Sequence, residues 1–196
     1  MVDLELIAHR VNTIDGLHEI PQHLGTEIDI RAWGSELILN HEPQENGDRL
    51  VDYLDEYVHG TLILNVKETG IEDQVLKLVR ERSEISSYFL LDVEFPYLFK
   101  ATSRGEKAVS VRFSEAEPIE SVEPFVESAN WVWIDTITRM PVNDSNINTL
   151  RRFRTCVVCP SLWKRSKDIA QCRQLAIKYG LTAVMTEAKH ISAWGG

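Results

Sequence analysis

The chain has 196 residues, of which 43% are hydrophobic and 26% are charged. This length suits one domain with a sizeable core, and the composition differs from that of disordered or membrane-spanning chains. A formal net charge of -9 argues against a nucleic acid as the main partner, because binding to a phosphate backbone depends on lysine and arginine. An anionic small-molecule substrate would therefore need a bound cation or a few well-placed basic side chains.

The three cysteines do not have the number or spacing of a disulfide framework. Cys156 and Cys159 have the spacing of a redox pair, but they lie within the apolar run 155–160, which favours burial in the core. Cys172 is the third. The N-terminus lacks the pattern of a secretion signal, and no apolar run approaches the roughly 20 residues that span a bilayer. We expect a cytoplasmic protein without a transmembrane segment, and the sequence leaves its oligomeric state open.

Eight short apolar segments are predicted to be strands. In chain order they span residues 4–7, 26–30, 61–66, 88–93, 108–113, 131–134, 155–158 and 182–185. The clearest helical patterns lie at 71–82 and at 164–179, where apolar residues recur on one face and Gly180 follows as a C-cap. Further helices are expected at 49–57, 117–128 and 145–153, shorter ones at 17–23 and 97–103, and a loop at 141–145.

Strand and helix patterns alternate along the whole chain. Such alternation predicts a parallel α/β sheet with right-handed crossovers. Eight units favour a compact (β/α)8 TIM barrel without an inserted subdomain, formed by residues 1–196 as a single domain. The chain is short for this fold, so several helices must be abbreviated.

Two carboxylates end the second predicted strand. Glu27 and Asp29 are two residues apart and therefore point to the same face, whereas Ile28 and Ile30 point to the other. Adjacent carboxylates repel each other and raise one another's pKa unless a positive charge compensates them. A divalent cation such as Mg²⁺ or Ca²⁺ would do so. The alternative is that one carboxylate lies on the surface and the other forms a salt bridge with Arg31 or Arg10.

Two histidines follow strand-like runs. His9 closes the first predicted strand, with Arg10 next to it, and His41 follows the apolar run 36–40. Active sites of (β/α)8 barrels lie at the carboxyl ends of the strands. If both imidazoles reach that end, they form an acid/base pair that works near neutral pH.

Asn65 and Lys67 close the third predicted strand with the same spacing of two residues. A lysine directed into a barrel mouth is costly unless an anion is present, and a phosphoryl group is such an anion.

At these residues the sequence resembles the glycerophosphodiester phosphodiesterase family. His9-Arg10 is similar to the family's His-Arg pair, Glu27-Ile-Asp29 to its Glu-x-Asp, His41 to its second histidine, and Asn65-Val-Lys67 to its acidic-x-Lys. The resemblance implies a barrel phosphodiesterase that binds one divalent cation through Glu27, Asp29 and the position of Asn65. It also implies that His9 and His41 are the general acid and base and that Arg10 and Lys67 bind the phosphate.

The chain departs from the family pattern at the third metal ligand. Asn65 is neutral where the family has a carboxylate, so a cation should bind more weakly unless another residue supplies the charge. Asp92, which follows the fourth predicted strand, is the candidate for this supplement. Arg112 and Asp135, at the ends of the next two strands, are further candidates for substrate binding.

Three functions are compatible with these residues. The leading hypothesis is a metal-dependent phosphodiesterase that acts on a glycerol-type, sugar-type or lipid-headgroup phosphodiester. The second is a barrel that has lost turnover and binds a phosphate ligand as a regulatory module. The third is an isomerase or lyase with Lys67 as a Schiff-base nucleophile, which would leave the histidines and paired carboxylates unexplained.

Overall fold

The computed structural model of the chain describes residues 4–195. It contains two compact units, which we call the N-terminal unit (residues 7–95) and the C-terminal unit (residues 4–6 with 96–195). Strand β1 (Glu5–Ala8) contributes residues to both. Each unit is described by itself.

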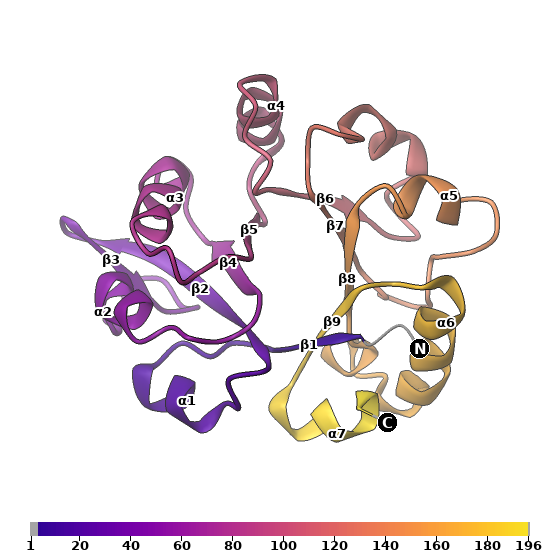
Figure 1. Cartoon of the computed structure of the whole chain (residues 1–196), viewed down its shortest axis with the longest axis horizontal. Helices are drawn as coiled ribbons and strands as arrows, with labels where there is room; N and C mark the ends of the chain where they lie inside the picture. The colour runs from indigo at the N-terminus through magenta and orange to yellow at the C-terminus, as the bar shows by residue number, and fades with distance from the viewer. Residues whose placement is uncertain (1–3, 196) are drawn as a thin grey trace. The chain divides into compact units, whose positions relative to one another are not determined.

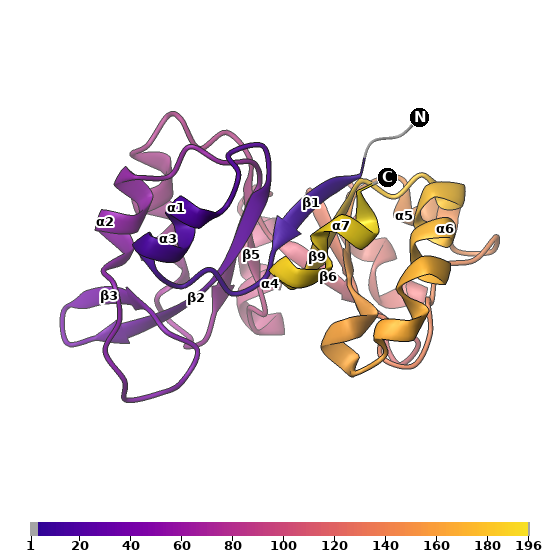
Figure 2. The same cartoon turned by 90° about the horizontal axis from the view of Figure 1, so that it is seen from below.

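The N-terminal unit is a parallel sheet with a hairpin. Its strands follow the order β5-β4-β2-β1, with β2 (Gly25–Trp33), β4 (Leu62–Val66) and β5 (Tyr88–Leu91), and β3 (Glu36–Leu39) pairs antiparallel with β2. Figure 2 shows β3 folded back along β2. Helices α1 (Ile14–Glu19), α2 (Leu50–Asp55) and α3 (Glu72–Arg80) alternate with these strands along the chain (Figure 1).

Local sequence explains these elements. In α3 the apolar residues Val75, Leu76 and Val79 are buried, as the helical spacing requires. Helix α1 begins at the Thr13 side chain, which accepts a hydrogen bond from the backbone N–H of Gly16. It ends before Pro21, because a proline disfavours helical backbone in the preceding residue.

The C-terminal unit continues from β1 in the order β1-β9-β8-β7-β6. Its strands are β6 (Ser110–Phe113), β7 (Trp131–Ile134), β8 (Arg154–Val158) and β9 (Ala183–Thr186), and its helices are α5 (Ile147–Leu150), α6 (Ile169–Tyr179) and α7 (Ile191–Trp194). Helix α4 (Phe95–Ser103) begins at the last residue of the N-terminal unit. Short 3-10 helices occupy Ile119–Ser121, Glu123–Phe125, Pro160–Trp163, Ser166–Asp168 and Ala188–His190.

The eight predicted strands are confirmed as β1, β2 and β4 to β9, each with its bounds shifted by a few residues at most. Helices and turns alternate with them, so the fold class is α/β with the topology of a (β/α)8 barrel. Between β3 and α2, at residues 40–49, there is no inserted subdomain. Within residues 4–195 no helix is long and apolar enough to cross a membrane.

Two predicted helices are corrected. Residues 117–128 form two 3-10 turns instead of an α-helix, because Pro118 and Pro124 remove backbone donors from this stretch. The helix predicted at 164–179 begins only at Ile169, since Lys164 adopts a left-handed backbone (φ 58°) that ends the preceding turn. Gly180 caps this helix as expected, with a φ of 66°.

The three cysteines are free and buried in the core. Burial raises the pKa of the Cys156 thiol well above its usual value, which keeps it protonated and unreactive. The prediction that these residues serve packing rather than redox chemistry agrees with this placement.

Candidate active site

The register of the N-terminal sheet brings the predicted polar residues to one end. Ala8 pairs with Thr26 across β1 and β2, and Asp29 pairs with Asn65 across β2 and β4. The strands are parallel, so the residues that follow them, among them His9, emerge at the same edge. The parallel register thus brings together two carboxylates from β2, an amide from β4, a lysine that follows β4 and an imidazole that follows β1.

Glu27 is completely buried and held through both oxygens. Oε1 accepts a hydrogen bond from Nδ2 of Asn65 at 2.8 Å, and Oε2 accepts one from the backbone N–H of Arg10 at 2.7 Å. The Nε2 atom of His9 lies 3.9 Å from Oε2. Arg10 has a left-handed backbone (φ 57°), a strained conformation for a side-chain-bearing residue that lets its N–H face the carboxylate.

Burial, and to a smaller extent the neighbouring Asp29, raise the pKa of Glu27 to about 7. The hydrogen bonds from Asn65 and Arg10 act in the opposite direction, because they stabilise the ionised form. Glu27 can therefore exchange a proton near neutral pH. Perturbed carboxyls of this kind are common in active sites.

Asp29 is also buried, with 1% of its surface exposed, and it is surrounded by cations and donors. Its Oδ1 atom lies 3.1 Å from Nζ of Lys67, and Oδ2 lies 3.4 Å from Nε of Arg10. Asn12 donates to Oδ2 through Nδ2 and accepts the backbone N–H of Asp29 through Oδ1, both at 2.8 Å. The two carboxylates are thus compensated by side chains of the protein itself.

His41 lies in the loop after β3, where Arg31 fixes the backbone. The guanidinium of Arg31 donates two hydrogen bonds to the carbonyl of His41, at 3.1 and 2.9 Å, and lies 3.3 Å from Oε1 of Glu68. The Nδ1 atom of His41 is 2.6 Å from Oε1 of Glu42. A carboxylate at Nδ1 orients an imidazole and leaves Nε2 for proton transfer.

The donor set of Glu27, Asp29 and Asn65 fits a hard divalent cation in its chemistry, because all its ligand atoms would be oxygens. The Oδ1 atom of Asn65 is buried and lacks a hydrogen-bond partner in the part of the chain that the structure describes. Within residues 4–195, however, no three side chains of the His, Cys, Asp and Glu types gather where they could hold a metal ion. A cation would thus depend on the Asn65 oxygen and would have to share Asp29 with Lys67.

Asp92 lies at the rim of the N-terminal unit. It is exposed, has a left-handed backbone (φ 57°), and lines a small cavity with Lys67, Glu68, Glu72 and Glu94. In the described residues it does not join Glu27 and Asp29 in a three-carboxylate group. Its role as a supplementary ligand stays a prediction.

Arg112 and Asp135 belong to the C-terminal unit, where they form an ion pair with each other. The Nε atom of Arg112 also lies 3.2 Å from Oε1 of Glu117. Asp135 is buried and Arg112 is partly exposed, so the pair compensates a buried carboxylate. Their part in substrate binding stays a prediction.

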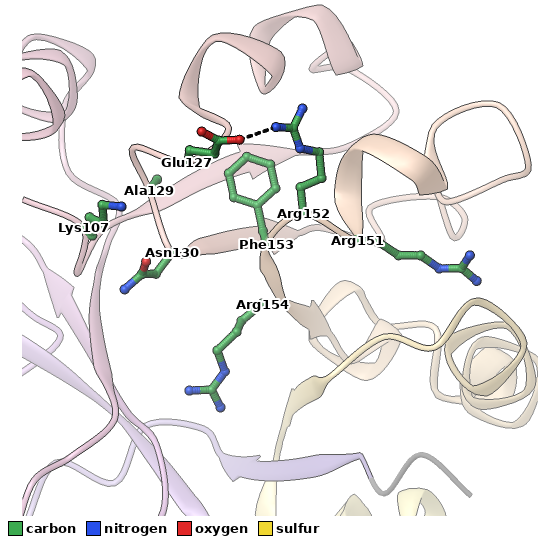
Figure 3. Close-up of a pocket in the computed structure, with 8 residues that line it drawn as sticks. All are labelled: Lys107, Glu127, Ala129, Asn130, Arg151, Arg152, Phe153 and Arg154. Atoms are coloured by element: carbon green, nitrogen blue, oxygen red, sulfur yellow. Dashed lines mark hydrogen bonds and ion pairs between the residues drawn. The ribbon is translucent and has the colours of Figure 1, made fainter.

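A second hollow lies in the C-terminal unit, at the amino ends of β7 and β8, and part of its lining is basic: Lys107, Arg151, Arg152 and Arg154 (Figure 3). Its arginines already have partners. Arg152 pairs with Glu127 at 2.6 Å and Arg154 with Glu5 at 3.0 Å. Figure 3 shows that Arg151 and Arg154 point in different directions. These cations do not converge, and the amino ends of barrel strands usually serve stability.

The roles of three residues of the site were not identified from the sequence. Asn12, Arg31 and Glu42 orient Asp29, the loop of His41 and the His41 ring, respectively. Glu42 is adjacent to His41, so its proximity was a usable signal. Asn12 and Arg31 act through contacts across the fold, and nothing in their spacing marks them.

Comparisons with known proteins support the assignment of the fold. No model of a protein family matches the sequence, and no curated protein matches it. Solved structures do match: a glycerophosphodiester phosphodiesterase from Agrobacterium tumefaciens has 13% identity and a TM-score of 0.67, over 94% of this chain and 97% of that one. The chain has the fold of the glycerophosphodiester phosphodiesterases.

A glycerophosphoryl diester phosphodiesterase from Parabacteroides distasonis matches with 14% identity and a TM-score of 0.66, over 98% of this chain and 88% of that one. A mutant tryptophan synthase α-subunit from Pyrococcus furiosus also matches, with 12% identity and a TM-score of 0.59, over 98% of this chain and 91% of that one. The same barrel thus carries unrelated chemistry, and function has to be argued from the residues of the site.

Proposed function

We propose that the protein is a phosphodiesterase of the glycerophosphodiester phosphodiesterase type, which cleaves a small phosphodiester by general acid–base catalysis. One observation carries the proposal: the buried pair Glu27 and Asp29 of β2 meets His9, which follows β1, and Lys67, which follows β4. Packing alone has little use for two buried carboxylates with cations at a strand end, because desolvating charges is costly. The likeness of the fold supports the same chemistry.

In this proposal the basic side chains bind and orient the substrate. Lys67 and Arg10 lie beside the carboxylates with part of their surface exposed, so both can contact phosphate oxygens. Arg10 can contact two oxygens at once, which would fix the orientation of the phosphoryl group.

His9 and His41 would transfer the protons. Glu27 lies near Nε2 of His9, and an adjacent carboxylate stabilises the protonated imidazole. Glu42 holds Nδ1 of His41, which leaves Nε2 to act on the substrate. One imidazole would take the proton of the attacking hydroxyl, which is either water or a hydroxyl of the substrate itself, and the other would protonate the leaving alcohol.

A divalent cation, Mg²⁺ or Ca²⁺, would be held by the carboxylates of Glu27 and Asp29 and the amide oxygen of Asn65, with Asp92 as a supplement. When bound, it would neutralise negative charge on the phosphoryl oxygens and lower the pKa of the attacking hydroxyl.

Hydrolysis of a panel of glycerol-type, sugar-type and lipid-headgroup phosphodiesters tests the proposal. Reactions contain Mg²⁺ or Ca²⁺, and the variants are His9→Ala and His41→Ala. We expect each substitution to lower kcat by about 10²-fold to 10⁴-fold. His18→Ala is the matched control, because His18 is exposed on α1 and forms an ion pair with Glu56, which is also exposed. Undiminished activity in both variants would refute the assignment.

A second candidate is a barrel that binds a phosphate ligand without turnover. This candidate is favoured because both carboxylate oxygens of Asp29 already have partners, Lys67 and Asn12. Calorimetric titration with a non-hydrolysable phosphodiester, followed by product analysis with the hydrolysable one, separates the two. Binding without product supports the module, and measurable turnover excludes it.

A further inference from the structure

Lys67 sits on the carboxylate oxygen that a divalent cation would need. Its Nζ atom lies 3.1 Å from Oδ1 of Asp29, and the side chain is 18% exposed. A cation ligated by that oxygen would lie about 2.0–2.6 Å from it. Two positive charges would then stand within a few ångströms of each other, and they repel.

The other oxygens of the pair are held by donors that are less able to leave. Oε1 of Glu27 is bonded by Asn65, and Oε2 by the backbone N–H of Arg10. Oδ2 of Asp29 is bonded by Asn12, which also accepts the backbone N–H of Asp29 and is thereby fixed twice, and Nε of Arg10 lies farther from the same oxygen, at 3.4 Å. Lys67 differs from these because its ammonium ends a flexible four-carbon stem.

We propose that Lys67 and a divalent cation exchange at Asp29. In the cation-free protein the ammonium of Lys67 neutralises Asp29. When the cation binds, Lys67 leaves the carboxylate and its ammonium becomes available to the phosphate of the substrate. The proposal rests on the cation-dependent phosphodiesterase function proposed above and adds a regulatory role for Lys67 at that site.

The neutral side chain of Asn65 makes this exchange consequential. With a third carboxylate at this position, the two side-chain cations Lys67 and Arg10 would leave one negative charge uncompensated, and a divalent cation would be needed to balance it. Here two side-chain cations, Lys67 and Arg10, balance the negative charges of Glu27 and Asp29 when no metal ion is bound. Lys67 therefore sets how tightly the cation binds.

Calorimetric titration with Ca²⁺ or Mn²⁺ alone, without substrate, tests the exchange in the full chain. Lys67→Met removes the competing charge and should tighten binding by about tenfold or more. Lys67→Arg keeps the charge and should bind close to wild type. Lys77→Met is the matched control, because it removes the same charge from an exposed position on α3. Equal or weaker cation binding by Lys67→Met than by wild type would overturn the proposal, as would the absence of binding in both.

A measurement on the wild type keeps the test valid if Lys67→Met folds poorly. Reductive methylation of lysines, quantified by mass spectrometry, reports how accessible each ammonium is. Addition of Ca²⁺ should raise the labelling rate of Lys67 and leave that of Lys77 unchanged. An unchanged rate at Lys67 under saturating Ca²⁺ contradicts the exchange.

The exchange and the proposed function can fail separately. If wild type hydrolyses phosphodiesters but Lys67→Met binds Ca²⁺ no more tightly, the exchange is wrong and the function stands. If Lys67→Met binds Ca²⁺ more tightly but wild type hydrolyses none of the panel, the function is wrong and the competition at Asp29 stands.

Discussion

Replacing Asn65 by aspartate should convert the site into one that depends on a divalent cation. The Nδ2 atom of Asn65 lies 2.8 Å from Oε1 of Glu27, so Asn65→Asp puts a carboxylate oxygen where a donor stood. Loss of a hydrogen bond to a buried charged group costs about 1–3 kcal/mol. Repulsion between two charges at about 4 Å would add about 4 kcal/mol at an effective dielectric constant of about 20.

The carboxyls can relieve most of this repulsion by sharing one proton. We therefore expect Asn65→Asp to lower the free energy of unfolding by about 1–3 kcal/mol in a chelator. For a chain of this size, that corresponds to a fall in Tm of roughly 2–12 °C. A cation that binds the new carboxylate should restore this loss, because ligands of the native state stabilise it by about 2.7 kcal/mol at 100 times their Kd.

Thermal unfolding followed by circular dichroism, in EDTA and across a Ca²⁺ titration, measures both effects. Gln74→Glu is the matched control, because it adds the same charge at an exposed position of α3. Equal Tm values for Asn65→Asp and wild type in EDTA would show that Asn65 is not a donor to Glu27. Equal Ca²⁺-induced shifts in the two proteins would show that position 65 does not face the cation.

Three further predictions concern pH, the histidine loop and a close backbone contact. The pKa of Glu27 is raised to about 7 by burial and by Asp29, so the native state holds a proton that the unfolded chain has lost above its ordinary value of 4.5. In EDTA the contribution of Glu27 to the free energy of unfolding is therefore most favourable below pH 4.5 and declines as pH rises to about 7. Urea unfolding from about pH 5 to about pH 8 should show a steeper decline of this free energy for wild type than for Glu27→Gln. Parallel curves for the two proteins would contradict the raised pKa of Glu27. Arg31→Met removes the two hydrogen bonds to the carbonyl of His41. We therefore expect kcat to fall by about tenfold and hydrogen exchange of residues 40–46 to accelerate. Unchanged exchange would show that Arg31 does not hold this loop. Gly25→Ala would place a Cβ atom 2.3 Å from the carbonyl oxygen of Thr61 and should cost more than about 2 kcal/mol, measured by urea unfolding. Gly34→Ala, which meets no atom within 4 Å and has a φ of +61°, should cost about 1–2 kcal/mol, and equal losses would show that the approach of β2 to Thr61 is not tight.

Much of the fold could be predicted from the sequence because it depends on local pattern. The eight strands are marked by short apolar runs, and α3 and α6 by helical spacing. The helix predicted at residues 117–128 is wrong because Pro118 and Pro124 impose 3-10 turns there.

The sequence by itself determined which residues could form the site. The spacing of Glu27 and Asp29 puts both carboxylates on one face of a strand. Lys67 directly follows the apolar run that forms the neighbouring strand. The sequence also predicted that two adjacent carboxylates need a compensating charge.

Only the tertiary structure decided which cations and hydrogen-bond donors contact the two carboxylates. Asn12 reaches Asp29 across 17 residues, and Asn65 reaches Glu27 across 38. Such pairings depend on strand register and on the rotamers that packing permits, which no local spacing encodes. Asn65 is therefore a hydrogen-bond donor to Glu27, and Lys67 is a cation placed at Asp29, because burial of Glu27 and Asp29 requires each oxygen to find a partner.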